Sequence, residues 1–178
     1  MHSVNEMATI NTRVLFERQL PSGVTLRQVI VKELDPNTQL SDNFRLCELA
    51  NNLAQDNVKA ILNNDVVKHI AMLQAFRTRL GRPCNVSSWY RTQNFNREVG
   101  GSANSLHLRA LATDIVFPKM SDTLYEKIEV LWRAVCQLYG AIGGINRYTN
   151  GVHLSSREDL LGYDAFVTRD YRGKKGDW

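Results

Sequence analysis

The spacing of apolar residues is compatible with an α+β fold class, in which two helices accompany four short strands within one domain. Apolar residues recur at helical spacing in segments 65–81 and 121–140. Four short β-prone segments bounded by turn residues lie at 84–90, 112–117, 141–148 and 151–156. The 178 residues, 43% of them hydrophobic and 22% charged, are enough to bury one sizeable core.

Residues 1–40 are expected to form an N-terminal arm or hairpin ahead of a main domain at residues 41–178. Two β-prone pieces, TRVLF and VTLRQVIV, flank a turn signal at Pro21-Ser22-Gly23, and a second turn signal follows at Asp35-Pro36-Asn37. From Asp42 onward the apolar spacing predicts a helix. Its apolar face would contain Phe44, Leu46, Leu49 and Leu53, followed by a second cluster at Val58, Ile61 and Leu62.

Two longer helices are predicted with their ends. In the first, Asp65 is placed to cap the opening amides and Gly81 to end the helix, with apolar residues at Val66, Ile70, Leu73, Phe76 and Leu80. The second opens near Ser121 and closes at Gly140, and its apolar stripe contains Leu124, Ile128, Leu131, Val135 and Leu138. A polar loop is expected at 91–105, around Gly100-Gly101, and the last two strands would be joined by a hairpin turn at Thr149-Asn150-Gly151.

Charge and cysteine content exclude several function classes. Cys47, Cys84 and Cys136 are widely spaced and form no CxxC unit, which argues against a disulfide framework or a cysteine zinc site. The net charge of +4 is mild, and its one dense cluster, Arg169 to Lys175, is interpreted as a solvated C-terminal face. No aromatic-interleaved basic motif supports nucleic-acid binding. Apolar runs are too short to enter a membrane, and the N-terminus lacks the features of a secretory signal.

His107 and Asp114 are the first residues that indicate chemistry. The histidine follows a glycine-rich loop, and the aspartate comes seven residues later within an apolar strand. A carboxylate in such a strand needs compensation, because an unpaired buried charge costs several kcal/mol. A metal ion would provide it. The alternative is that Asp114 accepts backbone hydrogen bonds and that His107 is an ordinary loop histidine.

A second histidine strengthens the metal interpretation. His153 also lies in a short β-prone segment, between Val152 and Leu154. Two imidazoles and one carboxylate occupy three corners of a zinc tetrahedron and leave the fourth open for water, as in catalytic zinc sites. Of the four histidines, His2 is terminal, and His69 is expected to be a surface or satisfied core residue without a catalytic role.

The pattern Ser105-x-His107-x-x-x-x-Ala112-x-Asp114 resembles the SxHxxGxAxD signature of the zinc D-Ala-D-Ala carboxypeptidases and L-alanyl-D-glutamate endopeptidases. The stretch NVSSWYRTQNFNREVGGSANSLHLRALATDI is similar to the family's strand, turn and Gly-Gly loop before that signature. The stretch GGINRYTNGVHLSSR resembles the family's GGIGxY…VHVDxR ending. The resemblance extends over roughly residues 42–160 and includes both motifs in the family's order.

The resemblance implies a fold, a cofactor and a set of roles. The fold would be α+β, with helices packed on a small, mainly antiparallel sheet, as in the hedgehog and D,D-peptidase group. Zn²⁺ would be bound by His107, Asp114 and His153. Arg91 would face the substrate and grip a carboxylate or the developing oxyanion. Ser105 and Tyr90 would contact the substrate or orient the metal ligands.

Three positions depart from the family pattern. Ala110 replaces a glycine, Ser155 replaces an aspartate, and Asn150 stands where some relatives have an acidic catalytic residue. Besides these three, Gly151 stands where other relatives have a second histidine. Asparagine cannot carry a proton, so no general base is identified. The carboxylates of Glu98, Glu158 and Asp159 lie near the motifs but are interpreted as solvated surface groups.

Two functional hypotheses follow from what the resemblance implies and from these departures. The first is a phage-encoded zinc peptidase that cleaves a D-amino-acid-containing bond in peptidoglycan stem peptides, made in the host cytoplasm and acting at the cell wall or carried in a virion. The bond would be D-Ala-D-Ala, L-Ala-D-Glu or a cross-link. The second is a zinc-containing binding or structural module that has lost turnover, which the missing base favours. The open fourth position favours the enzyme.

Overall fold

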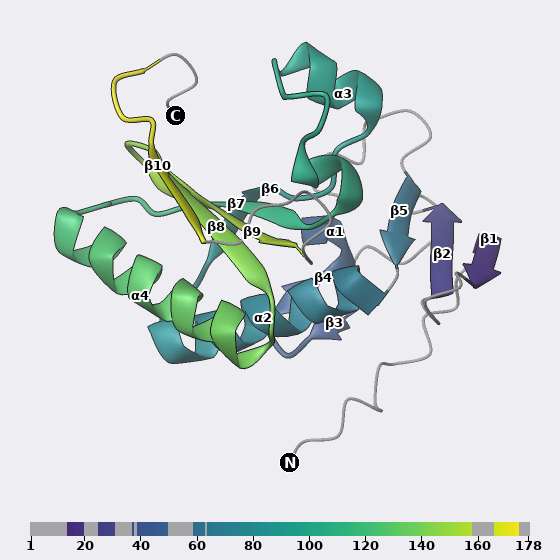
Figure 1. The fold of residues 1–178 in the computed structure, drawn as a ribbon, viewed down its shortest axis with the longest axis horizontal. Helices are drawn as coiled ribbons and strands as arrows, with labels where there is room; N and C mark the ends of the chain where they lie inside the picture. The colour runs from purple at the N-terminus through teal and green to yellow at the C-terminus, as the bar shows by residue number, and fades with distance from the viewer. Residues whose placement is uncertain are drawn as a thin grey trace.

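A five-stranded sheet forms the centre of the computed structural model (Figure 1). Its strand order is β10 (Val167–Asp170), β8 (Ile142–Arg147), β9 (Gly151–Arg157), β7 (Ala112–Val116) and β6 (Asn85–Ser88). All neighbours are antiparallel except β10 and β8. The structure describes residues 14–19, 25–30, 37, 39–49, 59–62, 64–157 and 166–174, and it describes only the backbone of 14–19, 25–30 and 59–62. The α+β class with a mainly antiparallel sheet is confirmed.

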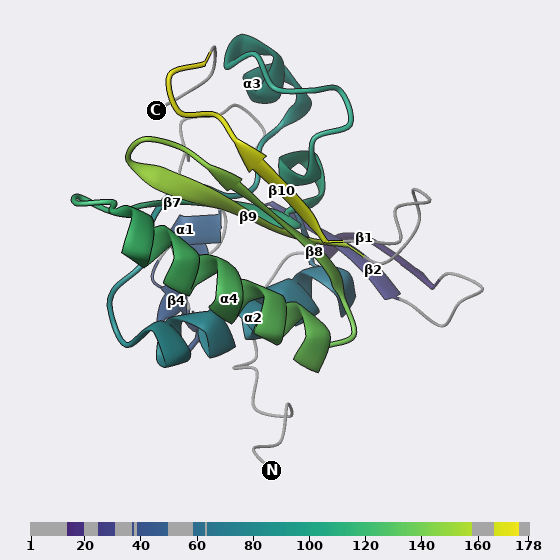
Figure 2. The ribbon, with the colours of Figure 1, turned by 60° about the vertical axis from the view of Figure 1, so that its left-hand side comes forward.

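Two long helices, α2 (Asn64–Leu80) and α4 (Asp122–Leu138), lie side by side under one face of this sheet (Figures 1 and 2). Their boundaries follow the predicted signals: the Ser121 hydroxyl accepts a bond from the amide of Leu124, and Gly81 and Gly140 have positive φ. Asp65 lies inside the first turn of α2 instead of capping it, because the helix begins one residue earlier. No helix among the described residues is long and apolar enough to cross a membrane.

The core lies between these helices and the sheet. Its largest fully buried side chains include Trp89, Trp132, Phe76 and Phe117. The two indoles are satisfied as well as buried, because Trp89 donates to the carbonyl of Ala110 and Trp132 donates to those of Gly144 and Ser155. These bonds fix two of the core residues against the strands and loop that carry the candidate metal ligands.

The opposite face of the sheet carries the short helix α3 (Gln93–Glu98) and the 3-10 helix η2 (Leu106–Arg109) (Figure 2). The expectation of an uninterrupted polar loop over 91–105 was therefore wrong. Helix α3 has too few turns for a visible apolar period, and its only strong local signal is Thr92, whose hydroxyl accepts from the amide of Phe95. Strand β10 was also missed. It pairs with β8, which lies about twenty residues earlier, and such a pairing leaves little local signal.

The segment after Asp42 differs from its expected helix. Among the described residues of this segment, Leu46–Leu49 is helical (α1), and Phe44–Arg45 forms strand β4, which pairs with β3 (Gln39–Ser41). Ile61 and Leu62 lie in strand β5 (Lys59–Leu62), which pairs with β2 (Thr25–Ile30), and β2 in turn pairs antiparallel with β1 (Val14–Gln19). The long-range pairing of β5 with β2 overrides the local helical spacing. Leu53 and Val58 lie outside the described residues.

Residues 169–170 at the end of β10 and 172–174 after it are exposed, as expected for this basic segment, whereas Tyr171 is half-buried and Lys175 lies outside the described residues. Arg172 forms ion pairs with Asp170 and with Asp122 at the first turn of α4. Arg147 of β8 also contacts Asp122. These charges hold the end of β10 against α4. The three cysteines are all free.

Candidate metal centre

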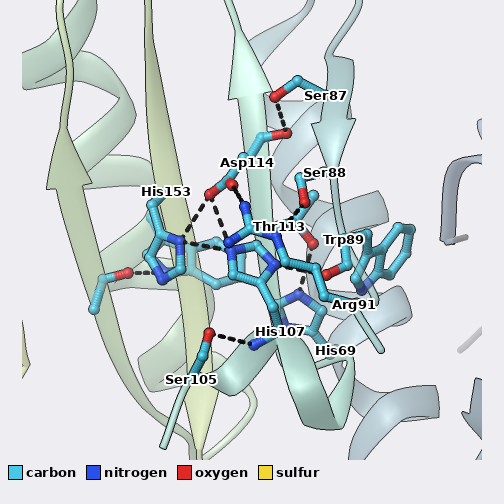
Figure 3. Close-up of polar contacts among 12 residues, drawn as sticks. His69, Ser87, Ser88, Trp89, Arg91, Ser105, His107, Thr113, Asp114 and His153 are labelled. Atoms are coloured by element: carbon cyan, nitrogen blue, oxygen red, sulfur yellow. Dashed lines mark hydrogen bonds and ion pairs between the residues drawn. The ribbon is translucent and has the colours of Figure 1, made fainter. Parts of the chain in front are cut away.

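His107, Asp114 and His153 converge in the structure, although they lie on η2, β7 and β9. His107 Nε2 is 3.2 Å from Asp114 Oδ1 and 3.2 Å from His153 Nδ1, and His153 Nδ1 is 2.8 Å from Asp114 Oδ1. Figure 3 shows the two imidazoles and the carboxylate pointing toward one another. Asp114 and His153 are direct partners in the β7–β9 pairing, so the sheet register itself brings them together.

The loop before β7 sets the orientation of His107. Ser105 caps η2 by accepting a hydrogen bond from the His107 amide at 3.3 Å. His107 Nδ1 lies 2.6 Å from the carbonyl oxygen of Trp89. A carbonyl can only accept, so Nδ1 carries the proton, and the neutral ring presents its Nε2 lone pair to the cluster. Burial lowers the pKa of His107 although Asp114 opposes this, which favours the neutral, metal-binding form.

The donor atoms fit a zinc ion. The lone pair of His107 Nε2 faces a carboxylate oxygen, and two acceptors at that distance repel each other unless a cation lies between them. Ligand atoms bound tetrahedrally at zinc lie roughly 3.4 Å apart, so shifts of about half an ångström or less convert the observed triangle into three corners of a zinc site. Two imidazoles and one carboxylate are also a ligand set found at catalytic zinc.

Arg91 lines the same cleft and also contacts the carboxylate of Asp114. Its Nη2 donates to Asp114 Oδ2 at 2.5 Å and its Nε donates to Ser88 Oγ at 2.7 Å, so the guanidinium links the carboxylate to Ser88 (Figure 3). Asp114 thus offers one oxygen to the histidines and the other to Arg91. Burial would raise the pKa of Asp114, but the hydrogen bond with His153 helps to hold the pKa below its usual range. The carboxylate is therefore ionised and oriented for a cation.

The cluster opens into a cleft of about 550 Å³. Arg91 and Ser105 line it, whereas Tyr90 is buried in the hydrophobic core and does not. Residues that the sequence did not single out also line the cleft: Asn146, Tyr148, Arg169 and Tyr171. Tyr148 lies within the GGINRY motif, which could have indicated it, but Arg169 and Tyr171 depend on the unpredicted strand β10.

His69 supports the centre from the other side of the sheet. It projects from α2, is fully buried, and contacts Ser156 Oγ at 2.6 Å and Thr113 Oγ1 at 3.0 Å. Burial lowers its pKa to about 3. His69 is therefore a satisfied core histidine, as expected. Through Thr113 of β7 and Ser156 of β9, it links the two strands whose other face carries Asp114 and His153.

The residues that depart from the family pattern lie at three different positions relative to the cleft. Ala110 ends η2 with φ of 56°, a left-handed conformation that explains why the signature prefers glycine there. Asn150 is exposed in the β8–β9 turn, and Ser155 is buried outside the cleft. Asp114 is the only carboxylate among the described cleft residues; Glu98 is exposed elsewhere, and Glu158 and Asp159 lie outside the described part of the chain.

Comparison with protein families agrees with this geometry. The model of the Peptidase M15 family matches residues 42–155, a segment that begins before the core helices and ends just after His153. Searches of curated proteins and of solved structures give no match. Because the matched segment covers more than half of the chain and contains all three candidate metal ligands, the chain belongs to the M15 family of peptidases.

Proposed function

We propose that the protein is a zinc-dependent peptidase that hydrolyses a D-amino-acid-containing bond in the stem peptides of bacterial peptidoglycan. The observation that carries this proposal is the His107, Asp114 and His153 cluster, whose donor atoms meet at the wall of a cleft. A structural zinc ion is usually enclosed by four protein ligands, whereas three ligands beside a cleft match the catalytic arrangement. Membership of a peptidase family supports the same chemistry.

Zinc bound by these three residues would supply Lewis-acid chemistry, activating water and polarising the scissile carbonyl. The chain's own residues prepare the site for it. The Trp89 carbonyl fixes the His107 tautomer, and Arg91 with Ser88 holds the Asp114 carboxylate. The Arg91 guanidinium also lines the cleft, so its free N–H groups can stabilise charge that develops on the substrate.

A second function is supported by a specific observation. Asp114 is occupied by Arg91 and the histidines, and no other carboxylate among the described residues lines the cleft. General acid–base catalysis contributes a factor of roughly 10² to 10⁴. A chain without this contribution would be a slow enzyme or a zinc-containing module that binds the cell wall without cleaving it.

Release of new amino groups from purified peptidoglycan distinguishes the two functions. The zinc-loaded protein, shown by metal analysis to hold one zinc ion, is compared with His153→Ala, which loses one ligand. Peptidase activity predicts amine release that is lost in the variant, and mass spectrometry of the products identifies the bond. If the zinc-loaded protein releases no more amine than His153→Ala, the peptidase proposal fails for this substrate and the binding module is favoured.

A further inference from the structure

Strand β10 extends the metal centre into a row of side chains that crosses the whole sheet. Arg169 pairs with Asn146, Asn146 with His153, His153 with Asp114, and Asp114 with Ser88. Side chains at directly paired positions lie on the same face of a sheet. Four members of the row, Arg169, Asn146, His153 and Asp114, line the cleft. The family match ends at residue 155, so Arg169 lies outside the matched segment.

The two cleft arginines differ in what they contact. Arg91 is bound to Asp114 and Ser88, so its charge is largely compensated within the protein. Among the residues that the structure describes, none forms a hydrogen bond or ion pair with the Arg169 guanidinium. Arg169 is exposed to the cleft. Among the described residues of the cleft, Arg169 is therefore the cation that remains available to an anionic ligand.

The backbone around Arg169 is fixed, so its side chain starts from a defined position. Arg169 is flanked by ladder pairs of β10 with β8, and the amide of Tyr171 donates to the carbonyl of Arg147 at 2.9 Å. The rings of Tyr171 and Tyr148 stack with centroids 5.4 Å apart and an interplanar angle of 13°. Both rings line the cleft. They form an aromatic wall next to the cation.

The distance between Arg169 and the candidate metal ligands is set by the strand spacing of the sheet. Arg169 is two strands from His153, a backbone separation of about 9–10 Å at the usual strand spacing. An extended peptide advances about 3.3 Å per residue, so this separation corresponds to roughly three residues of substrate. A bound peptide that reaches the metal ligands and extends toward β10 places its neighbouring residues beside Arg169.

We propose that Arg169, next to the Tyr148–Tyr171 wall, binds a free carboxylate of the peptide substrate within about three residues of the scissile bond. This inference rests on the proposed function, because it takes the peptide to be bound at His153. Arginine suits the task, since its planar guanidinium can donate two parallel hydrogen bonds to a carboxylate. Arg169 then acts as a specificity residue for the anionic form of the stem peptide, while Arg91 serves the metal ligand.

Equilibrium binding tests this assignment without requiring turnover. Calorimetry on the metal-free full-length chain compares a stem peptide ending in D-Ala-D-Ala with its C-terminal amide and with a peptide in which the D-Glu α-carboxylate is amidated. The chains are the wild type, Arg169→Gln, Arg169→Lys and the control Arg172→Gln. The control removes the same charge from the same segment, but Arg172 pairs with Asp170 and Asp122 and lies outside the cleft residues.

The wild type should bind the free acid roughly five- to tenfold more tightly than one of the two amides, as expected for an exposed charged hydrogen bond. The amidated peptide that binds more weakly shows which of the two carboxylates, the C-terminal one or that of D-Glu, contacts Arg169. Arg169→Gln should abolish this preference, and Arg169→Lys and Arg172→Gln should keep most of it. Equal binding of all three peptides by the wild type, no binding at all, or equal losses in Arg169→Gln and Arg172→Gln would overturn the assignment. The amine-release assay judges the proposed function separately.

Discussion

The ion pair between Arg91 and Asp114 gives the most direct test of how the metal centre is held. The side chains are 16% and 7% exposed, and their closest atoms are 2.5 Å apart. Removing one partner of a buried pair typically costs about 3–5 kcal/mol, because the other charge is left uncompensated. The residual exposure of Arg91 places the expected cost of Asp114→Asn at the lower end, about 3 kcal/mol in the metal-free protein. For a chain of this length, that is a fall in Tm of roughly 6–12 °C.

A double-mutant cycle separates the pair from its surroundings. Asp114→Asn, Arg91→Met and the double variant are unfolded in urea with a chelator present, and the transition is followed by the fluorescence of the buried tryptophans. We expect the double variant to be about 2–3 kcal/mol more stable than the sum of the single losses predicts. A coupling below about 0.5 kcal/mol would refute the argument. Arg91 would then not be a support for Asp114, and its expected role would be confined to the cleft that it lines.

Three further predictions concern the metal, pH and the backbone. Zinc at about a thousand times its Kd should stabilise the wild type by about 4 kcal/mol and raise its Tm by roughly 10 °C. In a thermal scan, His153→Ala should lose this shift in Tm. An equal shift in the variant would show that the ion binds elsewhere. His69 has a pKa of about 3 when folded and about 6.5 when unfolded, so its contribution to stability is complete above pH 6.5 and declines toward pH 3, by roughly 1.4 kcal/mol per unit. Urea titrations should show a shallower decline in His69→Gln, and an unchanged slope would contradict this. Ala110→Gly should raise the free energy of unfolding by about 1 kcal/mol, because it relieves a left-handed alanine, and a loss of stability would show that the methyl contacts outweigh the strain.

The sequence alone was most informative where local signals were strong. Helix α4 was predicted within about two residues because Ser121, a regular apolar stripe and Gly140 all agree on its limits. The β8–β9 hairpin followed from its turn residues. Asp114 and His153 were selected because polar residues in apolar strands need partners, and His107 because it follows a glycine-rich loop seven residues before Asp114; their convergence depended on the family resemblance. The structure supplies that convergence through the direct pairing of Asp114 with His153.

Features set by distant pairing were not accessible to local patterns. Ile61 and Leu62 have helical spacing with their neighbours, yet β5 pairs with β2. The contact between Arg91 and Asp114 joins two segments through a side-chain bond that no motif encodes. Arg169 was interpreted as part of a solvated basic tail, because nothing local indicates that β10 returns to the sheet beside β8.

The row of paired residues makes metal binding sensitive to strand register. Because side chains alternate between the two faces of a strand, a slip of β9 by one residue against β7 would send His153 to the helix-covered face and bring Val152 or Leu154 into the cluster. Such an arrangement retains most of a sheet's hydrogen bonds but has only two of the three ligands. Zinc bound by these ligands would therefore stabilise the native register over its nearest competitors, so the ion would select among alternative registers of the same sheet as well as supply its chemistry.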